Sequence, residues 1–474
     1  MDLLLTHGYF LADDAKEQRI MKPYVPLGIL YLSSHLRRQG MAVEVFDSTF
    51  STFDELESVL EAGPPAVLGI YANLMTRRNA VRILQAAKRS GWVTVAGGPE
   101  PGAYAAEYLA AGADVVVYGE GELTLEELVP VLRERQRCAR DSGRGLDLTG
   151  CEGIRGLAFL QADGRVCQTA PRPLIADLDA QPWPDRERVP VERYLAAWRQ
   201  HHGTGSVALI TARGCPYRCR WCSHAVYGRT HRRRDPDRVV EELEWVLGRY
   251  APDMLWIADD VFTIHHAWLE RYAAAMRERR LHIPFECISR ADRLNPAVLD
   301  RLAELGCFRL WIGSESGSQR LLDAMQRDVK VEQVQAAADM ARARGIQVGM
   351  FLMWGYADEE MADIEATVAH VKRADPDIFL TTVSYPIKGT PYFAELENSL
   401  TASAPWTETS DRELRIRGRH SRRFYSYADQ LLEAEVQLHR RQRAGAAEPD
   451  LNAFRTAVQS ARSGLLGAAA EVEA

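Results

Sequence analysis

The chain has 474 residues, of which 46% are hydrophobic and 26% are charged, and this composition is ordinary for a folded globular protein. Its length suits two or three domains. The formal net charge of −7 argues against nucleic acid as the main partner, and the basic run at 229–234 is short. No apolar run is long enough to span a bilayer, and the first residues lack the basic flank and length of a signal peptide. We therefore expect a cytoplasmic protein without a membrane span, whose thiols stay reduced.

Residues 1–138 alternate short apolar strands with helical stretches. The two clearest helices, 27–38 and 76–89, stop just before glycine residues, as is usual where a helix ends. Strict alternation of strand and helix predicts a doubly wound, Rossmann-like parallel sheet with helices on both faces. The expected strands are 3–6, 42–46, 67–71, 93–96 and 114–118.

Small and polar residues follow the third, fourth and fifth of these strands. Ligands of such sheets bind at the carboxyl ends of the strands, where glycine allows the backbone to approach a ligand closely. The candidate contacts are Asn73, Gly97, Gly98, Pro99, Gly119, Glu120, Gly121 and Glu122. The last loop matches the dinucleotide pattern GxGxxG only in part, because Thr124 occupies the position of the third glycine. A nicotinamide site is therefore disfavoured.

Three segments of this region resemble the cobalamin-binding domain that is attached to many radical S-adenosylmethionine (SAM) enzymes. They are Pro26–Leu32, Val93–Pro99 and Ala113–Glu122. The resemblance implies that cobalamin binds at the loops named above. The DxHxxG motif, which supplies a lower axial histidine in other cobalamin proteins, is absent, and neither His7 nor His35 has its spacing. The resemblance thus implies cobalamin bound without a protein histidine, or a domain that keeps the fold without the cofactor.

Residues 139–203 lack sustained periodicity and are expected to form a linker. Within it, 153–160 and 165–168 can pair as a hairpin around the turn dipeptide Asp163-Gly164. The proline-containing stretch 179–185 is expected to be extended, because each proline disfavours helix at the residue before it.

Three cysteines, Cys215, Cys219 and Cys222, lie within eight residues in the stretch Arg213–Cys222. The CxxxCxxC spacing favours a [4Fe–4S] cluster, since three thiolates bind three irons and leave the fourth open to an exogenous ligand. A zinc loop or buried structural thiols are the alternatives, but zinc sites usually have four ligands in paired spacings. The five other cysteines are scattered and are expected to be ordinary buried thiols: Cys138, Cys151, Cys167, Cys287 and Cys307.

The CxxxCxxC loop resembles the signature of the radical SAM superfamily. In that family the open iron binds the amino and carboxylate groups of SAM, and one electron from the cluster releases a 5′-deoxyadenosyl radical. Trp221, just before the third cysteine, fits the family's aromatic residue beside the cluster and adenine. The resemblance also implies an external electron donor such as flavodoxin or ferredoxin.

Residues 204–396 resume the alternation and are expected to form a partial (β/α)6 barrel. By analogy with full α/β barrels, its chemistry should lie at the carboxyl ends of the strands. The six expected strands are 207–211, 254–257, 283–288, 308–312, 347–351 and 378–383.

The ends of the second, third and fourth strands carry groups that resemble the family's SAM contacts. Asp259 and Asp260 can accept hydrogen bonds from the SAM ammonium, with a helix N-cap by Asp260 as the alternative. The Arg290 guanidinium suits the SAM carboxylate, unless it is a surface arginine. Glu315 and Ser316, within Gly-Ser-Glu-Ser-Gly, are expected to contact the ribose or the methionyl end.

The last two strands give weaker indications. Gly349–Tyr356 and then Glu359 resemble the segment that flanks adenine, although most of these side chains would also serve as core. Tyr385 and Lys388 are expected either to face the substrate or to belong to a structural turn. Residues 397–474 are expected to form a helical cap with a helix at 427–443, and the last twenty residues are expected to be frayed or disordered.

Taken together, these resemblances imply a cobalamin-dependent radical SAM enzyme. The leading hypothesis is methylation of an unactivated carbon of a small-molecule, secondary-metabolite substrate. A cobalamin-dependent cyclase or oxidase like the anaerobic porphyrin-ring cyclase, without methyl transfer, is the alternative. A non-catalytic cobalamin or iron–sulfur carrier is a third hypothesis, and the candidate SAM contacts speak against it, because a carrier needs no SAM site.

Overall fold

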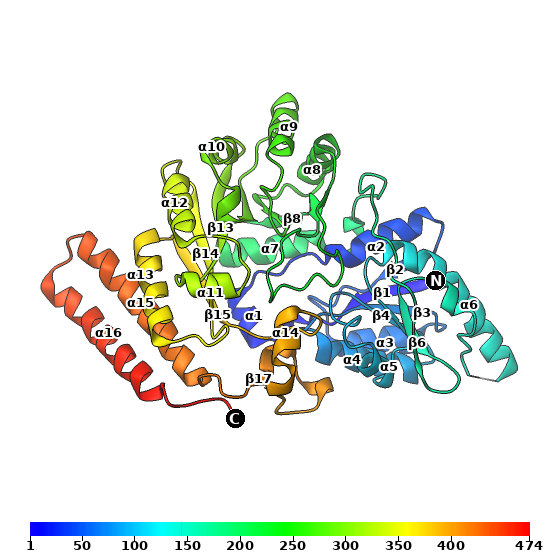
Figure 1. The fold of residues 1–474 in the computed structure, drawn as a ribbon. Coiled ribbons are helices and arrows are strands. Elements are labelled where there is room, and N and C mark those ends of the chain that lie inside the picture. The colour runs from blue at the N-terminus through cyan, green and yellow to red at the C-terminus, as the bar shows by residue number, and fades with distance from the viewer. Residues whose placement is uncertain (144) are drawn as a thin grey trace. The chain divides into compact units, whose positions relative to one another are not determined.

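The computed structural model describes residues 1–143 and 145–474 (Figure 1). Contacts divide the chain into two compact units, which we describe separately. Unit 1 comprises Met1–Pro216, Ser223–Leu255 and Ser403–Asp411, and unit 2 comprises Tyr217–Cys222, Trp256–Ala402 and Arg412–Ala474. Among the described residues, no helix has both the length and the apolar character that crossing a bilayer requires.

Unit 1 contains a seven-stranded sheet in the order β2-β1-β3-β4-β5-β6-β7. The first five strands pair in parallel, and β6 and β7 add an antiparallel hairpin beside β5. The strands are β1 Leu3–His7, β2 Val43–Val45, β3 Val67–Tyr71, β4 Val93–Gly97, β5 Val115–Val117, β6 Leu157–Leu160 and β7 Val166–Gln168. The helices are α1 Ala15–Ile20, α2 Leu27–Arg38, α3 Phe53–Ala62, α4 Arg77–Arg89, α5 Ala105–Ala110, α6 Glu122–Ser142 and α7 Val191–His202.

Helices cover both faces of this sheet, with α2 and α6 on one side and α3, α4 and α5 on the other (Figure 1). The strand order reverses between β1 and β3, and ligands of such sheets bind outside the carboxyl ends of the strands near this switch point. The predicted doubly wound sheet is confirmed. Helix α2 and strand β3 have the predicted bounds, because a continuous apolar strand and a helix before a glycine are strong local signals.

The hairpin predicted within the expected linker is present, but its place in the sheet and the helix α7 were not predicted. The hairpin formed by β6 and β7 joins the sheet and covers the edge of β5, which would otherwise expose unpaired backbone groups. Helix α7 buries Tyr194 and Trp198 one turn apart, and its polar residues obscured this short apolar stripe in the sequence.

The second sheet has the order β15-β14-β13-β12-β11-β8. Its six strands correspond to the six predicted strand–helix units, and β12 to β15 pair in parallel. The strands are β8 Ser206–Leu209, β11 Met254–Ile257, β12 Phe285–Ser289, β13 Cys307–Glu315, β14 Gln347–Trp354 and β15 Ile378–Val383. The helices are α8 Pro236–Tyr250, α9 His266–Glu278, α10 Pro296–Glu304, α11 Gln319–Ala324, α12 Val331–Arg342, α13 Met361–Ala374 and α14 Pro391–Leu396.

Two short strand pairs and two long helices complete the description of the elements that bear on function. β9 Ala212–Arg213 pairs antiparallel with β10 Arg232–Arg233, and β16 Leu400–Thr401 pairs with β17 Arg415–Ile416. Helices α15 Arg422–Arg443 and α16 Glu448–Ala468 pack on each other and on α13 and β14. The prediction of disorder in the last twenty residues is therefore wrong. The buried stripe of α16 consists of Ala461, Leu465 and Ala468. Because alanine is small and only weakly hydrophobic, this stripe is hard to recognise in the sequence.

Candidate functional site

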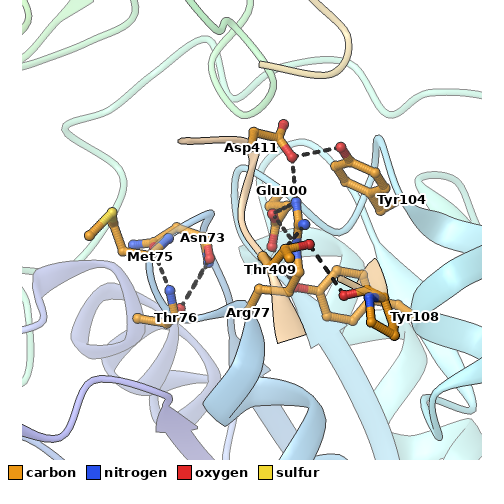
Figure 2. A network of polar contacts seen from close by, with 10 residues as sticks. Asn73, Met75, Thr76, Arg77, Glu100, Tyr104, Tyr108, Thr409 and Asp411 are labelled. Carbon is orange, nitrogen blue, oxygen red and sulfur yellow. Dashed lines mark hydrogen bonds and ion pairs between the residues drawn. The ribbon is translucent and has the colours of Figure 1, made fainter. Parts of the chain in front are cut away.

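The loops at the carboxyl ends of β3 and β4 contact each other in unit 1. The side-chain oxygen of Asn73 accepts hydrogen bonds from the backbone N–H groups of Met75 (2.9 Å) and Thr76 (3.1 Å), which starts α4 (Figure 2). Gly98 has a φ of +116°, and a Cβ there would overlap the carbonyl oxygen of Ala72. Glycine is thus required for this close approach of the two loops. The structure brings these two predicted residues to one edge of the sheet.

Both histidines that the sequence analysis considered have their ring nitrogens engaged. His7 contacts the Asp47 carboxylate at 3.1 Å through Nε2, and its Nδ1 accepts from the backbone N–H of Tyr9. His35 contacts Gln181 at 2.9 Å and Glu126 at 2.7 Å. Neither imidazole is free to bind a metal, so this edge of the sheet suits cobalamin held through loop backbone rather than through these two histidines.

The carboxylates of the loop after β5 are paired with arginines inside unit 1. Glu120 accepts from Arg213 at 2.8 Å with one oxygen, and with the other from Arg232 at 2.8 Å and the backbone N–H of Ile175 at 2.7 Å. Glu122 accepts from Arg213 at 2.6 Å. The glutamate side chains are thus occupied by protein partners, which leaves the backbone of the loop as the part that can meet a ligand. Gly119 has φ +78° and open space beside it.

A second buried ion-pair cluster lies next to Asn73, around Arg77 at the start of α4 (Figure 2). Arg77 donates to Glu100 at 2.8 Å and to Asp411 at 2.6 Å. The hydroxyls of Tyr104 and Tyr108 donate to Asp411 and Glu100, each at 2.6 Å. Burial raises the pKa of Glu100, although Arg77 opposes the shift. This cluster could not be predicted from the sequence, because its members are far apart along the chain.

The loop with the three cysteines begins at the short ladder of β9 and β10. Arg213 stands opposite Arg232 in this ladder. Gly214 follows with φ +87°, and a Cβ there would overlap the carbonyl oxygen of Thr230. The backbone therefore enters the loop through a position that only glycine fits, and Cys215 comes directly after it.

The other two cysteines of the loop belong to unit 2. The backbone N–H of Cys222 donates to the carbonyl of Cys219 at 3.2 Å, which forms a turn. The sulfur of Cys219 is buried and lies 3.8 Å from Nη1 of Arg290 and 3.7 Å from Nη1 of Arg327. Two guanidinium groups beside this sulfur suit an anionic ligand shell. This donor set fits an iron–sulfur cluster.

Arg290 was predicted to bind a ligand carboxylate, and its guanidinium already has protein partners. It donates to the Asp292 carboxylate at 2.8 Å and to the carbonyl of Arg327 at 2.7 Å, and it stacks on the Tyr217 ring at 3.6 Å. It is 1% exposed, so the alternative of a surface arginine is wrong. Through these contacts Arg290 faces the sulfur of Cys219.

Arg327 was missed by the sequence analysis. It donates to the carbonyl of Gly313 at 2.8 Å and lies 3.7 Å from the carboxylate of Glu315. Its neighbours Gln326 and Asp328 have φ values of +51° and +53°. Such backbone strain tends to occur at functional positions, but it is not visible in a sequence pattern.

Glu315 and Ser316 lie at the carboxyl end of β13, as predicted. Glu315 has φ +63°, and burial raises its pKa while Arg327 opposes the shift. Ser316 shares a hydrogen bond with Thr367 of α13 at 3.1 Å and accepts from the backbone N–H of Ser318 at 3.0 Å. The Ser316 hydroxyl thus fixes the loop to α13, and Glu315 is the member of the pair whose carboxylate stands beside Arg327.

An apolar group surrounds Trp221. Its ring lies 6.2 Å from that of Tyr356, which stacks on Tyr392 at 4.4 Å. Glu359 follows this segment and is 3% exposed. One of its oxygens accepts from the backbone N–H of Gly355 at 2.6 Å, and the other has no hydrogen-bond partner among the described residues. Burial raises the pKa of Glu359 to about 8.

The remaining predicted residues have simpler surroundings. Asp259, after β11, is buried, whereas Asp260 is exposed. Tyr385 and Lys388 are half-buried. The guanidinium of Arg412 lies 5.5 Å from the centre of the Tyr385 ring. Arg412 was missed because nothing in the sequence links it to the segment after β15.

Comparison with known proteins assigns two regions of the chain. Residues 209–371 match the profile of the radical SAM superfamily, and residues 20–129 match that of the B12 binding domain. The chain is 29% identical to an uncharacterised methyltransferase of Pyrococcus horikoshii over 80% of both chains. It is 26% identical to the anaerobic magnesium-protoporphyrin IX monomethyl ester cyclase of Rubrivivax gelatinosus, over 84% of this chain and 70% of the cyclase.

The fold is also that of a solved structure. It resembles the radical SAM methyltransferase TsrM from Kitasatospora setae, solved with cobalamin and a [4Fe–4S] cluster bound. The TM-score is 0.66 at 20% identity, and the match covers 87% of this chain and 81% of TsrM.

Proposed function

We propose that this chain, a radical SAM protein that carries a B12-binding domain, cleaves SAM to a 5′-deoxyadenosyl radical and methylates an unactivated carbon of a small molecule. One observation carries the proposal. The buried sulfur of Cys219 faces the guanidiniums of Arg290 and Arg327, and Arg327 in turn lies beside Glu315 at the end of β13. Arg327 therefore contacts both Cys219, a candidate cluster ligand, and the polar end of β13. We expect such an arrangement where a cluster lies next to a polar co-substrate.

The residues divide into three sets. Cys215, Cys219 and Cys222 would hold the cluster. Asp259, Asp260, Arg290, Glu315 and Ser316, with Trp221 nearby, would form the SAM site, where Arg290 acts by orienting the cluster loop through Tyr217 and Cys219. The loops with Asn73, Gly97, Gly98, Pro99 and Gly119–Glu122 would hold cobalamin. When bound, the cluster supplies the electron that cleaves SAM, and cobalamin supplies the methyl carrier.

Tyr385 and Lys388 are proposed to face the substrate. Arg412 beside Tyr385 adds a positive charge to this region of unit 2, which suits a substrate with an anionic or electron-rich group. We also propose an external one-electron donor such as flavodoxin or ferredoxin, a cytoplasmic location and no role for nucleic acid. Residues 1–138, 139–203, 204–396 and 397–474 remain our proposed division into domain, linker, barrel and cap.

The methyltransferase similarity over most of the chain supports methyl transfer, and the likeness to TsrM supports the use of both cofactors. The similarity to a cyclase supports the alternative function, a radical cyclisation. In that reaction the same radical leads to ring closure, and no methyl group enters the product.

Anaerobic incubation with SAM and dithionite tests the radical step. Protein reconstituted with iron and sulfide is expected to release 5′-deoxyadenosine, which is measured by chromatography. A Cys219→Ala variant is the matched control and should release none. If the wild-type protein holds a cluster and still forms no 5′-deoxyadenosine with any candidate substrate, the proposed radical chemistry is wrong.

Isotope labelling separates the two outcomes of the reaction. With SAM that carries a deuterated methyl group, methylation adds the labelled methyl to the product, whereas cyclisation leaves the product without label. Hydroxocobalamin added before gel filtration should give a corrin absorbance that stays with the protein. Absence of that absorbance would remove cobalamin from the proposal and leave the radical step standing.

A further inference from the structure

We propose that Glu120, Glu122 and Arg213 are positioning residues that fix the entrance of the cysteine loop to the loop after β5. This inference rests on the proposed function and extends it, because it links the candidate cobalamin loop to a ligand of the cluster. The sequence pattern gave Arg213 no role and assigned the two glutamates to cofactor contact.

The geometry is that of one arginine held between two carboxylates. Arg213 reaches Glu120 through Nη1 at 2.8 Å and Glu122 through Nη2 at 2.6 Å. These separate contacts fix both the position and the tilt of the guanidinium plane. The side chain is two residues before Cys215, and Gly214 between them is confined by Thr230. The backbone therefore has little freedom between the fixed arginine and the first cysteine.

Arg232 completes the arrangement from the other strand of the ladder. It stands opposite Arg213 and donates at 2.8 Å to the second oxygen of Glu120, so that this carboxylate bridges β9 and β10. The charges of this group of side chains balance, because two arginines face two glutamates. The side chains of Arg213, Glu120 and Glu122 are 6%, 4% and 5% exposed. Ion pairs so well shielded from water are screened much less by salt than exposed ones, and their contacts favour one geometry.

The same loop also offers its backbone at the carboxyl end of β5, where Gly119 has open space beside it. Ligands of parallel sheets bind at this end of the strands. A ligand that orders Gly119–Glu122 would therefore also order Arg213 and the start of the cysteine loop. Outer-shell contacts of this kind orient metal ligands and tune the metal site.

Arg213→Met tests this role, with Arg77→Met as its matched control. Both arginines are buried in unit 1, and both are held between two carboxylates, but Arg77 contacts Glu100 and Asp411 and no residue of the cysteine loop among its described partners. Both variants should lower the Tm. Only Arg213→Met should release cluster iron to a chelator faster than wild type, by on the order of tenfold. It should also change the electron paramagnetic resonance spectrum of the reduced cluster with SAM.

Two further, milder variants test the same inference if Arg213→Met folds poorly. Glu122→Gln leaves the Glu120 contact in place and should give an intermediate rate of iron release. Arg213→Lys keeps the charge and should restore part of the wild-type spectrum. If Arg213→Met and Arg77→Met release iron at the wild-type rate and show the wild-type spectrum, the residues are merely structural and the inference fails while the proposed function stands. If the wild-type protein itself assembles no cluster, the proposed function fails, and the inference falls with it.

Discussion

Buried charged side chains define the environment of the candidate site, and each is placed by partners that are distant in the sequence. Arg290 and Arg327 meet at the sulfur of Cys219, although 71 and 108 residues separate them from it. Glu359 differs, because one of its oxygens has only the backbone N–H of Gly355 as a partner. Burial therefore determines the pKa of Glu359, whereas contacts with other residues determine the positions of Arg290 and Arg327.

Replacing Glu359 with glutamine should change how stability depends on pH. Burial raises its pKa from 4.5 to about 8, so the folded protein keeps a proton that the unfolded chain loses. This stabilisation is fully present below pH 4.5 and is lost as the pH rises through 8, and linkage limits the loss to about 5 kcal/mol. Burial also lowers the pKa of His370 to about 4, which has the opposite effect but only below pH 6.5.

The measurement is the Tm between pH 6.5 and 9, where Glu359 acts without His370. Wild type should lose stability across this range, and Glu359→Gln should lose much less. Glu397→Gln, at an exposed position, is the control and should follow wild type. Parallel curves for wild type and Glu359→Gln would contradict the assignment of a protonated carboxyl.

Replacing Arg327 with glutamine should make the reduction potential of the assembled cluster more negative. Arg327 places a positive N–H donor 3.7 Å from the sulfur of Cys219, and such donors stabilise the reduced cluster. A redox titration followed by electron paramagnetic resonance measures the shift. Arg301→Gln, which removes a surface ion pair on α10, is the control. An unchanged potential in Arg327→Gln would mean that this contact does not persist in the loaded protein.

At the scale of single residues, the sequence predicted what was local and missed what was not. Asn73 and Gly98 were found because they follow strands directly. Arg213 and Arg232 are close to the cysteines, but a sequence cannot show that both meet Glu120. The run at 229–234 was interpreted as a local basic stretch, whereas Arg232 is a partner in a buried ion-pair cluster. Non-local pairing of charges determines these roles.

Elements were more predictable than contacts, since each strand or helix has its own periodicity. Strands β3, β11 and β15 have the expected bounds, whereas others differ by a few residues at their ends. One of these is β13, which continues through Gly313 to Glu315. That extension includes a register irregularity against β14 between Gly313 and Glu315. A bulge of this kind redirects side chains at a strand end, and no sequence period marks it.

Replacing Gly98 with alanine should disrupt the edge formed by β3 and β4. A Cβ would overlap the carbonyl oxygen of Ala72, and φ +116° is strained for any other residue, so the cost should be about 3 kcal/mol or more. The expected results are a lower Tm and loss of retained corrin absorbance after gel filtration. Gly63→Ala is the matched control, because Gly63 has negative φ and open space around it. Retention of cobalamin by Gly98→Ala at the wild-type level would show that this edge is not part of the binding site.

At the scale of the whole molecule, the course of the chain is unusual near its end. The segment Ser403–Asp411 belongs to unit 1, although the residues on both sides of it belong to unit 2. It is held by Asp411, whose carboxylate meets Arg77 and Tyr104, and by Trp406, whose ring lies 5.0 Å from the Arg77 guanidinium and packs against Tyr108. The segment Ser403–Asp411 is thus held within unit 1 by contacts centred on the buried Arg77, which sequence reasoning could not foresee.

Breaking this attachment should free the segment Ser403–Asp411. Arg77→Met leaves two carboxylates buried without their cation, and removal of one partner from a buried ion pair costs about 3–5 kcal/mol. Asp411→Asn should cost less, because Arg77 keeps Glu100. The double variant should be more stable than the sum of the two single effects predicts, which a double-mutant cycle in thermal unfolding measures. Limited proteolysis should cleave within Ser403–Asp411 faster in both single variants than in wild type. Additive effects with unchanged cleavage would show that Asp411 does not hold the segment and that its anchoring lies in the Trp406 contacts alone.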